Sequence, residues 1–109
     1  MEKPALTVNF YRSDAGVEPV RDWLKGLSTI DRKSIGEDIK TVQYGWPLGM
    51  PLVRKMGPAL WEVRIDLQGR IARILFTIEG GTMVLLHGFI KKSQRTPAAD
   101  LKTAMNRMK

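Results

Sequence analysis

The sequence predicts a single α+β domain, and three observations support this prediction. The chain has 109 residues, which is enough for one compact hydrophobic core and too few for a second domain. Some segments repeat apolar residues at helical spacing, and others alternate apolar with polar residues as half-buried strands do. Their order is one strand, two helices, three strands and a helix. It predicts an antiparallel sheet of about four strands, with two N-terminal helices and one C-terminal helix packed on one face.

The first strand and the two N-terminal helices are predicted before residue 45. Residues 7–11 alternate as a strand would. Pro19 suits the first turn of a helix whose apolar side chains recur every three or four positions. Ser28 stands three residues before Asp31, an arrangement typical of a helix N-cap, and opens a second helix.

The second half of the sequence predicts an antiparallel β-meander followed by a helix. Residues 45–58 contain three glycines and three prolines, which exclude a helix and permit only brief extended pieces, so we expect an ordered loop packed on the domain. Three β runs follow at Leu60–Asp66, Arg70–Ile78 and Thr82–Ile90, joined by short glycine-containing turns. The third run is apolar on both faces, as a strand covered on both sides would be. Thr96 and Pro97 open the last helix.

The positive charge lies in the second half of the chain. Eighteen Lys and Arg against eleven Asp and Glu give a net charge of +7, and residues 1–53 contribute equal numbers of both signs. This asymmetry indicates a polyanionic partner, most commonly nucleic acid; the alternative is a basic surface kept for solubility. No apolar run is long enough to cross a membrane, and cysteines and a secretory leader are absent, so we expect a cytoplasmic protein without membrane contact.

Several other chemistries are excluded. A chain with one histidine and no cysteine cannot build a familiar zinc site, and no glycine-rich phosphate loop is present, so neither a metal nor a cofactor is expected. The three tryptophans Trp23, Trp46 and Trp61 could stack on bases, but each falls in an apolar pattern and is expected in the core.

Four segments together resemble the RelE/ParE toxin superfamily, most closely its HigB-like, phage-derived host-inhibition branch. They are Gly49-Met50-Pro51-Leu52-Val53, Leu60-Trp61-Glu62-Val63-Arg64, Gly69-Arg70-Ile71-Ala72-Arg73-Ile74-Leu75-Phe76 and Leu86-His87-Gly88-Phe89-Ile90-Lys91-Lys92-Ser93-Gln94. The resemblance implies a microbial RNase-like fold whose open sheet face accepts messenger RNA in the ribosomal A site. It also implies a type II toxin, a metal-independent endoribonuclease that inhibits translation, and a cognate antitoxin, often of the helix-turn-helix type.

Matched to the family residue by residue, four basic positions form the expected active site: Arg64, Arg73, Lys91 and Lys92. Attack of a ribose 2′-hydroxyl on the adjacent phosphate builds negative charge, which fixed guanidinium and ammonium groups stabilise. Arg64 and Arg73 are assigned to this stabilisation, and Lys91 or Lys92 to proton transfer. The alternative is that the arginines face solvent on the sheet and the lysines end a strand.

Weaker candidates surround these positions. Phosphate contacts that position RNA are expected from Arg54, Lys55, Arg70 and Arg95. His87 is the only histidine and a candidate for acid–base catalysis. By strand alternation, however, it shares a face with Met83, Leu85 and Phe89, which favours a packed residue. Residues 93–97 offer no acid comparable to that of some superfamily members.

Two other functions remain open on the same fold, because a fold alone does not determine function. One is a ParE-like toxin that inhibits DNA gyrase without ribonuclease activity. The other is a nucleic-acid-binding module without enzymatic activity. The basic positions on the predicted strands favour the ribonuclease.

Overall fold

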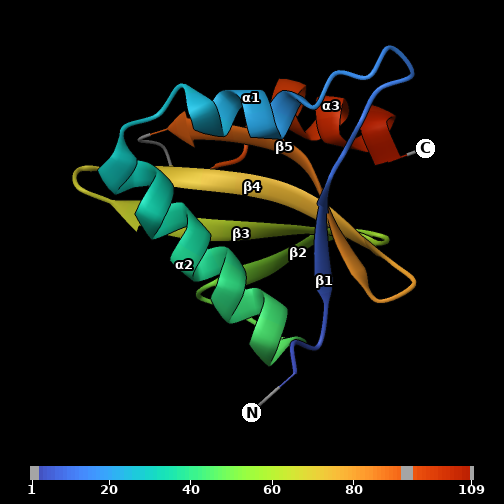
Figure 1. Cartoon of the computed structure of the whole chain (residues 1–109), viewed down its shortest axis with the longest axis horizontal. Helices are drawn as coiled ribbons and strands as arrows, with labels where there is room; N and C mark the ends of the chain where they lie inside the picture. The colour runs from blue at the N-terminus through green and yellow to red at the C-terminus, as the bar shows by residue number, and fades with distance from the viewer. Residues whose placement is uncertain (1–2, 92–94, 109) are drawn as a thin grey trace.

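The computed structural model describes residues 3–91 and 95–108, which form an α+β domain with a five-stranded sheet and three helices (Figure 1). In chain order the elements are β1 (Thr7–Phe10), α1 (Pro19–Lys25), α2 (Thr29–Gly45), β2 (Val53–Gly57), β3 (Leu60–Leu67), β4 (Arg70–Glu79), β5 (Thr82–Lys91) and α3 (Ala98–Met108). Within the described part of the chain, no helix has the length and apolar character needed to span a membrane.

Local sequence signals placed several element ends correctly. Pro19 lies in the first turn of α1. The Ser28 hydroxyl accepts a hydrogen bond of 3.1 Å from the Asp31 amide at the start of α2, which confirms the predicted N-cap. Gly80 and Gly81 form the two-residue turn between β4 and β5, and both have the positive φ that such a turn requires.

The sheet is mixed and has one more strand than predicted. Its order is β1-β5-β4-β3-β2, and β1 pairs with β5 in parallel, so the expectation of a wholly antiparallel sheet is wrong. The added strand, β2, lies within the segment 45–58 that was expected to be a loop. It runs along the sheet edge between Pro51 and Pro58, where proline is tolerated. Local alternation does not specify the direction of a distant partner, so the pairing of β1 could not be predicted.

Helices cover both faces of the sheet, which corrects the prediction that all pack on one face. α1 and α2 lie on the face of Ile74 and Phe76, where α2 crosses the strands in Figure 1. α3 packs through Ala104 on the opposite face, against Leu75 and Leu86. As the sequence predicted, the apolar residues on both faces of β5 are therefore covered. The sheet face that carries α3 is called the α3 face below.

A bulge in β5 reverses which residues point to which face. Phe76 pairs with Leu85, but the preceding Leu75 pairs with His87, so Leu86 is the extra residue. Met83 and Leu85 consequently lie on the side of α1 and α2, whereas His87 and Phe89 lie on the α3 face. The expectation that His87 shares a face with Met83 and Leu85 is wrong for this reason.

All three tryptophans pack against the core, as predicted. Trp46 meets Trp61 edge to face, with 5.2 Å between the ring centroids. Trp23, from α1, lies over Gly88 of β5, and a Cβ added at Gly88 would stand 2.5 Å from a carbon of the Trp23 ring. Gly88 therefore lets α1 approach the sheet.

Replacing Gly88 by alanine should lower the free energy of unfolding by about 1–3 kcal/mol, because Trp23 has to move. Gly36, exposed on α2, is a matched control, since an added Cβ there meets no atom within 4 Å. Gly36→Ala should raise the free energy of unfolding by up to about 1 kcal/mol. Urea unfolding followed by tryptophan fluorescence measures both changes. Equal effects at the two positions would contradict the contact between Trp23 and Gly88.

Candidate functional site

The strand register brings three of the four expected active-site residues to the α3 face. Arg64 of β3 stands directly opposite Arg73 of β4, and Arg73 stands opposite Phe89 of β5. Lys91 ends β5 opposite Ile71, one alternate position from Arg73, so it shares this face and is exposed. Lys92 lies outside the described residues. Arg64, Arg73 and Lys91 thus share one face of the sheet, although their environments differ.

Arg73 is fully buried, which the sequence did not predict. Its Nη1 lies 3.4 Å from Oε1 of Glu62, and both side chains are 0% exposed. The same Nη1 donates a hydrogen bond of 3.2 Å to the Thr96 hydroxyl, which in turn donates to Glu62 Oε2. These three residues, called the Arg73 cluster below, tie the segment before α3 to β3 and β4. In this arrangement Arg73 holds structure together and is not accessible to a phosphate from solvent.

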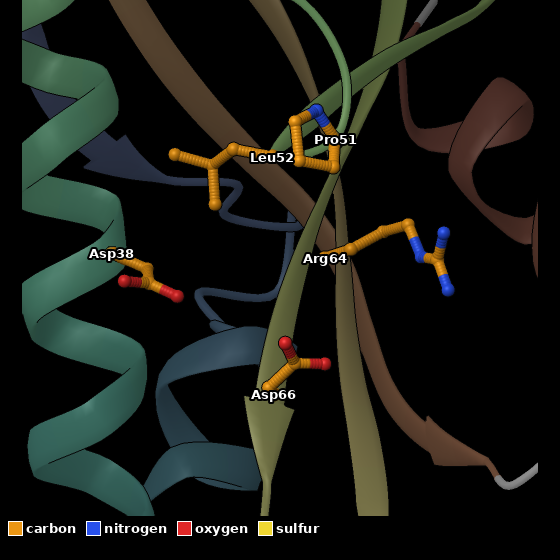
Figure 2. A pocket seen from close by; sticks show the side chains of 5 residues that line it. All are labelled: Asp38, Pro51, Leu52, Arg64 and Asp66. Atoms are coloured by element: carbon orange, nitrogen blue, oxygen red, sulfur yellow. The ribbon is translucent and has the colours of Figure 1, made fainter.

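Arg64 is half-buried beside a shallow pocket at the edge of the sheet (Figure 2). The pocket is lined by Asp38, Pro51, Leu52, Arg64 and Asp66. Figure 2 shows the Arg64 side chain extending from β3 away from α2 and Asp38. Burial raises the pKa of Asp38 above its ordinary value, and the negative charges of Asp66 and Glu37 raise it further. Strand alternation puts Asp66 on the same face of β3 as Arg64, whereas Asp38 comes from α2 on the other face.

His87 has partners at both ring nitrogens. Nε2 lies 2.6 Å from Oδ1 of Asp100, in the first turn of α3, and Nδ1 lies 3.4 Å from Nη1 of Arg107. Arg107 also donates to the Leu86 carbonyl oxygen at 2.9 Å. Because a guanidinium only donates, this arrangement fits a neutral imidazole that donates from Nε2 to Asp100 and accepts at Nδ1. An acid thus lies beside the histidine. It is Asp100 of α3, whereas the sequence analysis considered only residues 93–97.

The four weaker candidates separate into two groups. Arg54 and Arg95 are exposed and line a second pocket, between β2 and the start of α3. Lys55 lies on the other face of β2, with its Nζ 6.0 Å from the centre of the Trp61 ring. Arg70 forms an ion pair of 3.0 Å with Asp31, which joins the hairpin between β3 and β4 to α2. Arg54 and Arg95 are therefore the pair that the structure brings to one surface.

A comparison with known protein families identifies the family of this chain. A family model described as phage-derived protein Gp49-like (DUF891) matches residues 22–109, which include every candidate site residue. The chain belongs to the phage-derived Gp49-like family. This is a family of RelE/ParE-like toxins of toxin–antitoxin systems. No curated protein matches the chain significantly. The place of this Gp49-like chain in the HigB-like branch stays a prediction.

Sequence reasoning missed three polar residues of the candidate site: Glu62, Thr96 and Asp100. Glu62 lies between the core residues Trp61 and Val63, and alternation alone places it on the polar face of its strand, with no sign that it is buried. A signal for Asp100 was available, because Asp100, Ala104 and Arg107 recur at helical spacing and Ala104 is buried. Thr96 offered no such signal, since its role depends on how the chain turns back over the sheet.

Asp38→Asn should stabilise the Gp49-like chain near neutral pH. Because the pKa of Asp38 is raised in the folded chain, its ionised form is less favourable there than in the unfolded chain. The ionised Asp38 therefore lowers the stability of the wild type only when the pH is above the ordinary aspartate pKa of about 4, and the full effect is reached above the raised pKa. At lower pH the carboxyl group is protonated in both the folded and the unfolded chain, so the gain from Asp38→Asn should vanish in acid. Unfolding at about pH 7 and about pH 3 measures it, with Glu79→Gln as an exposed control. A gain of equal size at both pH values would contradict the prediction.

Arg73→Met should lower the free energy of unfolding by about 3–5 kcal/mol, because it leaves the buried Glu62 carboxylate without its arginine. Changing Glu62 to leucine as well removes the buried charge, so the double variant should be more stable than Arg73→Met alone. Thermal and urea unfolding of the three chains measure the difference. A double variant that is no more stable than the single one would contradict the buried ion pair.

Proposed function

We propose that this Gp49-like chain is the HigB-like toxin of a type II toxin–antitoxin system and inhibits translation by ribosome-dependent cleavage of messenger RNA. One observation carries the proposal. The α3 face gathers basic side chains from four neighbouring strands, Arg54, Arg64, Arg73 and Lys91, beside the hydrogen-bonded pair of His87 and Asp100. Glu62 balances the charge of the buried Arg73, so an anionic ligand on this face would meet Arg54, Arg64 and Lys91.

The proposed reaction needs no metal and no cofactor. The ribose 2′-oxygen attacks the adjacent phosphorus, the bond to the 5′-oxygen breaks, and the products carry a 2′,3′-cyclic phosphate and a 5′-hydroxyl. Negative charge grows on the phosphoryl oxygens, and Arg64 stabilises it with a guanidinium held by the sheet. Lys91 supplies a second positive charge from the end of β5, and Lys92 follows it in the sequence.

His87 is the proposed proton-transfer group. Asp100 fixes the imidazole through Nε2, which orients Nδ1. Nδ1 contacts Nη1 of Arg107 at 3.4 Å, which is longer than the 2.6 Å contact between Nε2 and Asp100. Movement of Arg107 onto a bound phosphate would leave Nδ1 able to accept the proton of the attacking 2′-hydroxyl, while the leaving 5′-oxygen takes up a proton from solvent.

Arg73 acts in this proposal as a positioning residue in the conformation observed. It holds Thr96, and through it the start of α3, against the sheet. In this conformation its side chain is 0% exposed and makes no contact with a phosphate from solvent.

The partner of the toxin is proposed to be a cognate antitoxin of the helix-turn-helix type, as the family association with toxin–antitoxin systems supports. Such an antitoxin would neutralise the toxin by covering the basic α3 face or the helices. Messenger RNA and the ribosome are the proposed targets.

Primer extension on messages from cells that briefly express each protein tests the proposal. New ends within translated regions should appear with the wild type, and Arg64→Ala and His87→Ala should each lower the cleavage rate roughly 10²–10³-fold. Arg21→Ala is the matched control, because Arg21 is exposed on α1.

Two results would contradict the ribonuclease. Growth arrest with intact messages and gyrase-dependent DNA breaks would identify a ParE-like toxin. Salt-sensitive RNA binding without cleavage or arrest would identify a nucleic-acid-binding module.

A further inference from the structure

The pocket between β2 and the start of α3 has a composition that the proposed catalytic groups do not explain. It measures about 510 Å³, within the range of small-molecule sites. β2 contributes Arg54 and Met56, and the segment that enters α3 contributes Arg95, Thr96, Pro97, Ala98 and Leu101. Two chain segments that are distant in sequence therefore build it together.

The polar part of the pocket favours an anion. Arg54 and Arg95 stand on its two walls, and both are exposed. Among the described residues that line it there is no carboxylate. The first turn of α3 adds the partial positive charge of a helix N-terminus to the two guanidinium groups. The three positive contributions converge on one opening.

The apolar part of the pocket favours a ligand that also has a flat, apolar surface. Met56, Pro97 and Leu101 line it alongside the arginines. A free phosphate would use only the cationic part, and a nucleotide would use both, with its phosphate at the arginines and its base or ribose against the aliphatic side chains.

The pocket adjoins the proposed catalytic groups through two direct links. Arg54 of β2 stands opposite Glu62 of β3 in the strand register. Thr96 belongs both to the pocket lining and to the Arg73 cluster. Because the Arg73 cluster holds Thr96, the wall formed by the start of α3 is fixed before a ligand arrives.

We propose that this pocket binds one nucleotide of single-stranded RNA next to the cleaved bond, with Arg54 and Arg95 on its phosphate and Met56 against its base. The inference rests on the proposed function for the identity of the polymer. It adds a subsite that holds a base as well as a phosphate, whereas the arginines alone would only attract the backbone.

Fluorescence anisotropy with a labelled 2′-O-methyl oligonucleotide tests the subsite, because this strand lacks the attacking hydroxyl and cannot be cleaved. Arg54→Gln and Arg95→Gln should each weaken binding about fivefold. Each should also lower the slope of log affinity against log salt by about 0.7, the value for one phosphate contact on a single strand. Arg21→Gln makes the same charge change on α1 and should alter neither quantity.

An abasic strand with the same number of phosphates tests the apolar wall. The wild type should bind it more weakly than the base-bearing strand, and Met56→Ala should reduce that difference without changing affinity for the abasic strand. Equal affinity of the wild type for both strands, or an unchanged salt slope in both arginine variants, would overturn the proposal. Melting temperatures of all variants establish that the chains are folded.

Cleavage in a translation extract, measured on the same proteins, separates the two proposals. Loss of RNA affinity in the pocket variants supports the subsite even if the wild type cuts no message. Cleavage by the wild type with unchanged binding in the pocket variants removes the subsite and leaves the ribonuclease.

Discussion

The buried ion pair between Arg73 and Glu62 is the interaction on which the α3 face depends. Two charged groups with no exposed surface are costly to bury, and they are tolerated only when they satisfy each other and their neighbours. Here the Thr96 hydroxyl contacts both members, so the cluster links β3, β4 and the segment that leads into α3. Without this link α3 would be held only by the apolar contacts of Ala104 and its neighbours and by the hydrogen bonds of Asp100 and Arg107 to β5, among the residues that the structure describes.

The docked helix creates the rest of the site. Asp100 reaches His87 only because α3 lies across β5, and Arg107 reaches the same imidazole from the far end of the helix. The bulge at Leu86 is equally necessary, since without it His87 would point to the side of α1 and α2. The position of α3 and the extra residue Leu86 in β5 thus bring Asp100 and His87 together beside the basic side chains of the α3 face.

The sequence predicted much of the fold where the signal was local. The Ser28 cap, the Gly80-Gly81 turn and the β4–β5 pairing follow from residue types at short spacing. The parallel pairing of β1, the strand β2 and the docking face of α3 depend on contacts distant in sequence, and periodicity carries no information about them. The bulge was missed because an extra residue leaves the apolar pattern of β5 intact.

In the candidate site, too, local signals predicted some features, and features that depend on distant contacts were missed. Alternation along β3 and β4 was sufficient to place Arg64 and Arg73 on one face, because that depends only on strand parity. Parity says nothing about what covers a face, so Arg64 could not be distinguished from the fully buried Arg73. Arg73 therefore couples stability to the proposed chemistry: a substitution there disturbs the packing of α3 as well as any contact with RNA. Arg64, at the sheet edge and outside the buried ion pair, is the position where an effect on chemistry can be separated from an effect on folding.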